Sequence, residues 1–417
     1  MFMSRLDDLI KSLCPDGVKC YNLGAIAELR SGWGFPVKEQ GNKIAEIPFY
    51  KVADMNNSLI FMGEASNYVT HETAQKLKCN PAPKGTIIFP KVGATIRTDK
   101  KRIIVTDSCY DNNIMGVIAK ESIVNSKYLY YYLSKVPLIT FTKGEGAVPS
   151  ISKESLSNFK LPIPPLEVQE EIVRLLDDFT AKTAELQDKL NEELEARKKQ
   201  YEYYRNAILN GDKNAETVKL GDVCDFVRGP FGGALKKDSF VSSGYAVYEQ
   251  QHAIYQNTNI RYFIDSKKYN DLIRFKVSPN DIIVSCSGTI GKTYIIPNDA
   301  PKGIINQALL KLTAHDCLNV RYLQYIFENN LVKIMNNNAR GGAIKNVPSV
   351  KELKNIEIQL PSNDTQGRII NILDNLESTC DNLQTNISVE FESRQKQYEY
   401  YRDKLLTFKE LNESEVN

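Results

Sequence analysis

The chain repeats itself at a fixed offset, and this duplication constrains its fold more than any other feature. Residues 195–205 read EARKKQYEYYR and residues 392–402 read ESRQKQYEYYR, so nine of eleven positions are identical at an offset of 197. The same offset, without a gap, aligns Pro164 with Pro361, Gln169 with Gln366, Ile172 with Ile369, Leu176 with Leu373, and Asp177 with Asp374. A duplicated chain of this kind builds two related units.

The segments that precede the two matching stretches also correspond, although more weakly. Tyr128-Leu129 matches Tyr322-Leu323, and the run Val148-Pro-Ser-Ile matches the run Val347-Pro-Ser-Val. The chain therefore reads as domain, helix, domain, helix. The predicted boundaries are 1–157 for the first domain, 158–212 for the first long helix, 213–354 for the second domain and 355–417 for the second long helix.

Each matching stretch has the periodicity of an amphipathic helix. From residue 167 to about 210, apolar residues recur in steps of three and four, and the second copy repeats the pattern. A helix of about 44 residues at 1.5 Å per residue is roughly 65 Å long and needs a partner for its apolar stripe. Its own repeat is the nearest partner, and a twofold relation between the repeats predicts an antiparallel coiled-coil pair.

The two predicted domains are rich in β-branched and aromatic runs with turn residues between them. Strands are expected around residues 86–89, 102–105, 281–284 and 293–296, and short helices around 127–134 and 321–329. The predicted fold class is α+β, with two pseudo-twofold-related α+β domains separated by two long antiparallel helices.

Charge alternates along the chain, although the net charge is only +2. Residues 1–157 carry +5 and residues 211–354 carry +6, whereas residues 158–210 carry −3 and residues 355–417 carry −6. Basic domains indicate a polyanionic partner, and acidic helices indicate solvated surfaces or a protein partner.

Within the basic domains, cationic residues gather beside glycine and aromatic turns. Cations on such turns suit phosphate contact, and neighbouring polar groups can read base edges. Any single residue of this kind is more often a solvated loop position, but the set recurs in both domains and favours nucleic acid. The predicted DNA-binding residues are Trp33, Lys38, Lys91, Arg97, Lys100, Lys101, Arg102, Lys143, Arg228, Phe231, Lys236, Lys237, Lys292, Arg340 and Lys345.

The QYEYYR ends of the helices carry more aromatic residues than one helix seam can bury. Tyr203 and Tyr400 are expected to point to solvent, where exposed tyrosine favours protein interfaces. We therefore predict a subunit-docking surface at each end, formed by Tyr201, Tyr203, Tyr204 and Arg205 in the first copy and Tyr398, Tyr400, Tyr401 and Arg402 in the second.

Motifs for catalysis, metals or nucleotides are missing from the sequence. Eight scattered cysteines form no Cys-x-x-Cys pair, and three distant histidines have no metal-ligand spacing, so no metal site is expected. Gly288-Thr-Ile-Gly-Lys292 resembles the end of a P-loop but has two residues where that loop needs four. No run is long enough to span a membrane and the N-terminus is no signal peptide, so a cytoplasmic location is expected.

Taken together, these features resemble the specificity subunit of type I restriction–modification systems. The resemblance covers nearly the whole chain and rests on the duplication, the PIPPLEVQ run at 162–169, the QYEYYR helices, the VPSISK run at 148–153 and the LCPDGV run at 13–18. The second copy departs from the pattern at its helix start, where PSNDTQ replaces PPLEVQ.

The resemblance implies that each domain is a target-recognition domain for one half of an asymmetric, interrupted DNA sequence. It implies that the helices space the half-sites and dock two methyltransferase subunits, with two restriction/translocase subunits in the restricting form. S-adenosylmethionine, ATP and Mg²⁺ would then bind to those partners, and this chain would bind no cofactor directly and would not be an enzyme. It also implies double-stranded DNA as a ligand and no membrane.

Three alternatives stay open at the level of sequence. The chain could be a specificity subunit of a related combined restriction–methylation enzyme. It could be a catalytic NTPase or methyltransferase, against which the missing motifs argue. It could be a coiled-coil scaffold without a DNA function, whose basic domains would then have no salt-sensitive affinity for DNA.

Overall fold

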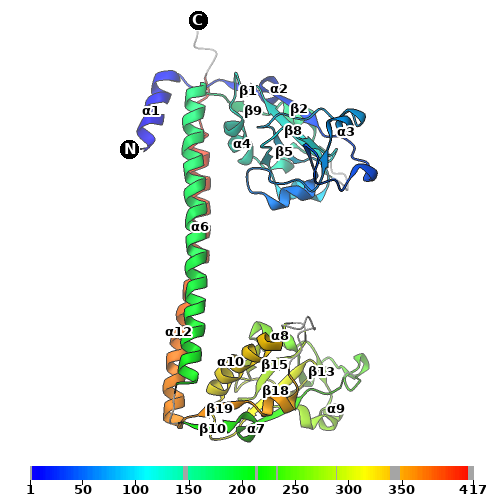
Figure 1. Ribbon diagram of the computed structural model, residues 1–417, viewed down its shortest axis with the longest axis vertical. Coiled ribbons are helices and arrows are strands. Elements are labelled where there is room, and N and C mark those ends of the chain that lie inside the picture. The colour runs from blue at the N-terminus through cyan, green and yellow to red at the C-terminus, as the bar shows by residue number, and fades with distance from the viewer. Residues whose placement is uncertain are drawn as a thin grey trace. The chain divides into compact units, whose positions relative to one another are not determined.

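The computed structural model describes residues 2–143, 149–211, 215–231, 233–287, 289–338 and 348–411. The chain falls into two compact units, residues 1–188 with 389–417 and residues 189–388. Two long helices, α6 (Leu166–Leu209) and α12 (Asn363–Leu405), cross the boundary, so each unit contains about half of each helix (Figure 1).

The first unit is built on a four-stranded antiparallel sheet. Its strand order is β2 (Ala27–Ser31), β8 (Ile114–Ala119), β5 (Ile87–Pro90) and β6 (Arg102–Ile103). All four residues of β5 are buried, because Ile87 and Phe89 pack into the core beneath the helices while Ile88 packs into a core on the opposite face. This continuous apolar run is what a strand covered on both faces requires.

Smaller elements complete the first unit. A second sheet joins β4 (Tyr68–Val69), β3 (Ile47–Tyr50) and β7 (Cys109–Tyr110), and β1 (Cys20–Asn22) pairs with β9 (Lys160–Pro162). The helices are α1 (Phe2–Leu13), α2 (Leu23–Ile26), α3 (His71–Lys76), α4 (Ser126–Ser134) and α5 (Lys153–Ser157), with 3-10 turns at Val37–Glu39, Val52–Asn57, Ala94–Thr98 and Leu138–Phe141.

The second unit repeats this plan with one additional strand. Its main sheet runs β11 (Cys224–Arg228), β18 (Leu309–Ala314), β15 (Ile282–Ser285), β16 (Thr293–Ile295), and its second sheet runs β13 (Phe263–Ile264), β12 (Tyr245–Tyr248), β17 (Gly303–Ile305), β14 (Lys276–Val277). β10 (Glu216–Lys219) pairs with β19 (Glu357–Leu360). The helices are α7 (Leu220–Val223), α8 (Gln250–Tyr255), α9 (Ser266–Asp271), α10 (Val320–Asn338) and α11 (Val350–Lys354), with 3-10 turns at Lys237–Ser239 and Ile273–Phe275.

The two long helices run antiparallel within each unit. In the first unit the rings of Phe179 in α6 and Tyr401 in α12 lie 5.5 Å apart, which places the start of one helix beside the end of the other. In the second unit Leu209, near the end of α6, shares a core with Ile369 and Leu373 near the start of α12. The predicted α+β class with long antiparallel helices is therefore confirmed.

Two predicted details differ from the structure. α10 continues to Asn338, nine residues beyond the predicted end at 329. Phe391, a member of the predicted apolar stripe, stays partly exposed. A pair of helices covers only one side of each apolar stripe, which leaves Phe391 in contact with solvent. A larger helix bundle would bury the whole stripe. In the part of the chain that the structure describes, no helix is long and apolar enough to cross a membrane.

Candidate nucleic-acid interface

One end of the main sheet gathers most of the predicted DNA-binding residues of the first unit. Because neighbouring strands are antiparallel, the last residues of β2 and β5 lie at the same end as the first residues of β8 and β6. Trp33 follows β2, Lys91 follows β5, and Arg97 and Lys100 precede β6. Residues up to 67 positions apart in sequence are thus brought to one set of loops.

The second unit presents the corresponding set at the corresponding end. Arg228 is the last residue of β11 and Phe231 lies three residues further along. Lys292 lies in the turn between β15 and β16, where its backbone N–H donates to Ser285 Oγ at 3.0 Å. Two domains that share this framework therefore expose different side chains from equivalent loops.

A glycine anchors the first of these loops in each unit. Gly32 N donates to Ile114 O at 3.1 Å, and Gly229 N donates to Leu309 O at 2.9 Å. A Cβ at Gly32 would lie 2.0 Å from Asp111 O, and one at Gly229 would lie 1.9 Å from the oxygen of Asn306. Only glycine allows this close approach, so the loop begins at the same place in both units.

Several of the predicted contact residues are open to solvent. Phe231 is 96% exposed. Trp33 is half-buried, and its ring centroid lies 5.7 Å from that of Tyr110. Burial lowers the pKa of Lys91, which is also half-buried, while the carboxylate of Asp111 opposes that shift. The exposed cations of the set are Lys38, Arg97, Lys143, Arg228, Lys236, Lys237 and Lys292.

Three of the predicted contacts have partners inside the domain. The Lys101 side chain is 2% exposed and its ammonium lies 2.8 Å from Asp99 Oδ1, so the expectation of a solvent-facing cation does not hold there. The guanidinium of Arg102 donates to Lys101 O at 2.7 Å and to Met55 O at 3.2 Å. Lys100 Nζ donates to Asn56 Oδ1 at 2.5 Å. Sequence alone could not distinguish these three basic residues from their exposed neighbours.

Lys143 lies beside the loop that follows β5, because its backbone N–H donates to Ser150 O at 3.4 Å and the neighbouring Ile151 N donates to Lys91 O at 2.9 Å. Lys143 forms an ion pair with Glu154, both exposed. Arg340 and Lys345 lie outside the described residues. The turn that resembles a P-loop is a tight connection between β15 and β16, in which Gly291 N donates to Ser285 O at 2.8 Å, and Gly288 lies outside the described residues. Among the described residues, no group of three His, Cys, Asp or Glu side chains could hold a metal ion.

The helix ends expose tyrosines as predicted. Tyr203 is 69% exposed and Tyr400 is 62% exposed. Each lies edge-on to the next tyrosine, with ring centroids 5.5 Å apart for Tyr203 and Tyr204 and 5.4 Å apart for Tyr400 and Tyr401. The predicted exposure is therefore confirmed, and the docking role stays a prediction.

The other four residues predicted for docking are less exposed. Burial raises the pKa of Tyr201 to about 12, and the carboxylate of Glu377 adds to this shift. The guanidinium carbon of Arg205 lies 5.5 Å from the centre of the Tyr201 ring. Tyr398 is also half-buried, and Arg402 pairs with Asp403 at 2.9 Å.

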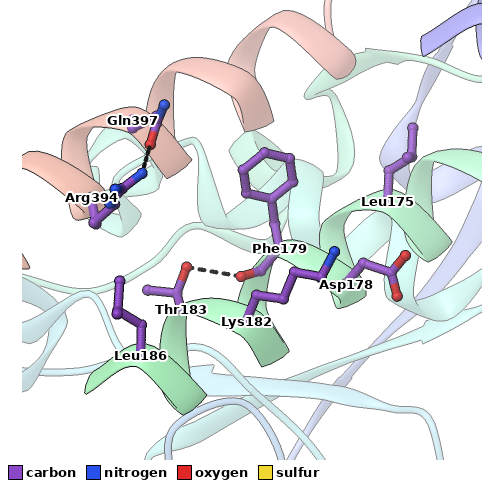
Figure 2. A pocket seen from close by; sticks show the side chains of 8 residues that line it. All are labelled: Leu175, Asp178, Phe179, Lys182, Thr183, Leu186, Arg394 and Gln397. Atoms are coloured by element: carbon purple, nitrogen blue, oxygen red, sulfur yellow. Dashed lines mark hydrogen bonds between the residues drawn. The ribbon is translucent and has the colours of Figure 1, made fainter. Parts of the chain in front are cut away.

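The first unit has a groove between the two helices near one of these ends. Figure 2 shows it between α6 and α12, with the ring of Phe179 between the two helices. Its volume is about 430 Å³, and it is lined by Leu175, Asp178, Phe179, Lys182, Thr183, Leu186, Arg394 and Gln397. The groove is an apolar surface flanked by charged side chains.

The attachment of each domain to its helix depends on residues whose role the sequence did not reveal. Gln169 and Gln366 are fully buried. Gln169 accepts a hydrogen bond from Asn125 N at 2.8 Å and donates to Pro164 O at 2.7 Å and Ile123 O at 3.0 Å. Gln366 repeats this pattern with Asn319, Pro361 and Cys317. Identity between the repeats at a polar position was the signal that could have identified this role.

Comparison with known proteins places the chain in a family. The model for the type I restriction modification DNA specificity domain matches residues 15–196 and again residues 212–393. A putative type I restriction enzyme specificity subunit of Haemophilus influenzae is 32% identical over 71% of this chain and 76% of its own length. A type I restriction enzyme specificity subunit of Escherichia coli is 29% identical over 68% of this chain and 70% of its own length.

Solved structures share the fold. A chain from a type I restriction–modification system, studied for complex assembly and conformational transition, has a TM-score of 0.72 at 15% identity and covers 94% of this chain and 98% of its own length. The HsdS subunit of Thermoanaerobacter tengcongensis has a TM-score of 0.59 at 15% identity, covering 94% of this chain and 97% of its own. The chain belongs to the family of type I restriction–modification specificity subunits, with two copies of the DNA specificity domain.

Proposed function

We propose that the chain is the DNA-recognition subunit of a type I restriction–modification complex and that each unit reads one half of a two-part site. The observation that carries this proposal is the gathering of exposed cations and aromatic rings at the same end of the main sheet in both units. Duplicated loops on a shared framework can differ in sequence without disturbing the cores beneath them. That arrangement suits two readers of different half-sites.

Affinity and sequence choice would come from different groups in these loops. Exposed cations such as Arg97 and Lys292 neutralise phosphates, so affinity should fall steeply with salt. Base contacts supply discrimination of about 1–3 kcal/mol per good pair. Two short half-sites on one chain gain specificity by avidity when their spacing matches that of the protein. We assign the spacing role to α6 and α12.

The methylation and restriction reactions would be catalysed by partner subunits. We propose that two methyltransferase subunits dock at the tyrosine-bearing helix ends and that restriction/translocase subunits join in the restricting form. S-adenosylmethionine, ATP and Mg²⁺ would bind to those partners, and this chain would act without catalysis of its own. The near-repeat of Tyr203 and Tyr204 at Tyr400 and Tyr401 supports two equivalent docking surfaces.

The test is a genome-wide map of methylated bases in host cells with and without this gene. Loss of adenine methylation at one interrupted, two-part motif on deletion supports the proposal and identifies the target. Replacing residues 213–354 with those of a homologue should then change one half of the motif and leave the other unchanged. If methylation persists unchanged in the deletion strain while the partner methyltransferase is expressed, the proposal is wrong.

The spacing role has a separate test. Inserting two helical turns into both α6 and α12 should change the number of bases between the half-sites and leave the half-site sequences unchanged. An unchanged spacing in an insertion variant that still directs methylation would contradict the role assigned to the helices.

A further inference from the structure

We propose that Phe231 stacks on a DNA base within the half-site that the second unit reads, an inference that rests on the proposed function. A phenyl ring exposed to this extent, 96%, leaves almost all of its apolar surface in water. It lies three residues beyond the end of β11, at the end of the main sheet where Arg228 and Lys292 are also exposed.

Described residues before and after Phe231 are fixed by backbone hydrogen bonds and burial. Gly229 N donates to Leu309 O at 2.9 Å, and Pro230 is buried. On the other side, Ala234 N donates to Phe231 O at 2.9 Å and Leu235 is buried in a core with Val247. The loop is therefore anchored at both ends, while the ring at its tip faces solvent. A ring on a loop with anchored ends costs less backbone conformational entropy when it stacks on a ligand.

The equivalent loop of the first unit has a different residue at this position. The position two residues after the anchoring glycine is Gly34 there, and a Cβ at Gly34 would meet nothing within 4 Å. The aromatic residue that follows, Phe35, turns inward, and its ring lies 3.8 Å from that of Phe49, almost parallel to it. The shared framework therefore needs no exposed ring at this loop, and Phe231 is a feature of the second unit.

The charges around Phe231 favour a nucleic-acid base as its partner. Arg228 precedes it, Lys236 and Lys237 follow it, and all three are exposed. A polyanion binds beside these cations, and a ring that wedges between two base pairs of a duplex stacks on the face of the adjoining base. An aromatic ring that stacks on a base contributes through its π-face, so an aliphatic side chain of similar size should not replace it.

The experiment uses the full chain without methyltransferase subunits, so that no base is flipped by a partner. The probe is a duplex with the mapped motif in which 2-aminopurine replaces one base at a time in the half-site assigned to the second unit. We expect the wild-type chain to change the emission at one position. Phe231→Ala and Phe231→Leu should both abolish that change and weaken binding about 5- to 100-fold, whereas Phe231→Tyr should preserve both.

Two further measurements separate stacking from other effects. The slope of log affinity against log salt should be the same for Phe231→Ala and wild type, because no phosphate contact is lost. Ile44→Ala is the matched control, since Ile44 is 95% exposed on a loop of the first unit. Its affinity and emission should equal those of wild type, and circular dichroism should show the same helix content for all variants.

The outcomes distinguish this inference from the proposed function. Wild-type affinity and emission in Phe231→Ala would overturn the stacking role and leave DNA recognition intact. Wild-type affinity and emission change in Phe231→Leu would also overturn it, because stacking requires the ring. A wild-type chain with no sequence-specific, salt-sensitive binding to the mapped motif would instead contradict the proposed function.

Discussion

The phenol of Tyr131 donates a 2.6 Å hydrogen bond to Asp177 Oδ1, joining α4 of the first recognition domain to α6. The second unit repeats this bond between Tyr325 and Asp374, also at 2.6 Å. A cation accompanies each carboxylate, Lys127 at 2.6 Å from Asp177 Oδ2 and Arg321 at 2.9 Å from Asp374 Oδ1. Together with the buried glutamines, these bonds fix the orientation of each domain on its helix.

Removal of the Tyr131 hydroxyl should loosen the first domain from its helix. Because the acceptor is an ionised carboxylate, Tyr131→Phe should cost about 1.5–3 kcal/mol of stability, toward the lower end because Asp177 is partly exposed. Tyr325→Phe should have a similar effect in the second unit. Urea denaturation measures the loss. Tyr203→Phe, at an exposed tyrosine, is the control and should change stability little.

Glu328 should make the second unit less stable as the pH rises. It lies in α10, accepts a hydrogen bond from Thr293 and faces Arg205, Arg321 and Glu377. Burial raises its pKa, so the folded chain holds this proton more tightly than the unfolded chain does. The contribution of the protonated carboxyl is fully present below the ordinary pKa of 4.5 and is lost as the pH rises through the folded pKa.

Replacement of Glu328 by a neutral amide tests this dependence. Glu328→Gln cannot ionise, so at pH 8 it should be more stable than wild type, and the difference should vanish as the pH falls toward 4. Thermal unfolding at a series of pH values measures it. Glu202→Gln, at an exposed carboxylate of α6, should show no such trend. A Glu328→Gln variant that is less stable than wild type at every pH would contradict the prediction.

Exposed and buried cations of the basic set should behave differently in DNA binding. Arg97→Ala and Lys292→Ala each remove an exposed charge and should lower the slope of log affinity against log salt by about one. Lys101→Met removes a buried ammonium that pairs with Asp99, so it should lower the melting temperature and leave that slope unchanged. Fluorescence anisotropy across a salt series measures the slopes. Equal slopes for all four proteins would show that these loops do not contact phosphates.

The exposed tyrosines should matter for assembly and not for folding. The double variant Tyr203→Ala, Tyr400→Ala loses two side chains that are mostly in solvent, so its stability should stay within about 0.5 kcal/mol of wild type. If these residues are docking anchors, co-purification with the methyltransferase subunit should fall sharply. Mass photometry of the complexes gives the stoichiometry. Normal assembly of the double variant would contradict the docking surfaces assigned here.

Much of this architecture could be predicted because it is periodic or repeated. The stripe from Ile172 onward identifies a helix by its spacing, and the strand at Ile87–Pro90 follows from a short apolar run between turn residues. The N-terminal helix α1 was not predicted, although the apolar spacing of its 12 residues is that of an amphipathic helix. The second sheet around β3 was not predicted either. The strands of this sheet are two to four residues long and pair with strands far away in sequence, so no local pattern identifies them.

The sequence predicted which kinds of residue form the candidate interface, but only partly where those residues lie. Basic residues beside glycine turns predicted loops such as those of Arg97 and Lys292, which the structure places at one end of the main sheet in each unit. Lys100, Lys101 and Arg102 read as one exposed basic cluster in sequence. The fold turns Lys101 inward onto Asp99, because alternate residues of an extended segment face opposite sides.

The sequence by itself determined the duplication, the two long helices, the α+β class and the alternation of basic and acidic segments. These properties follow from local spacing and from identity between the repeats. Only the tertiary structure decided which cations reach solvent, that Gln169 and Asp177 hold the first domain to its helix, and that Phe231 is exposed while Phe35 stacks on Phe49. Burial and hydrogen bonding depend on residues that lie close only after folding, so no pattern along the chain encodes them.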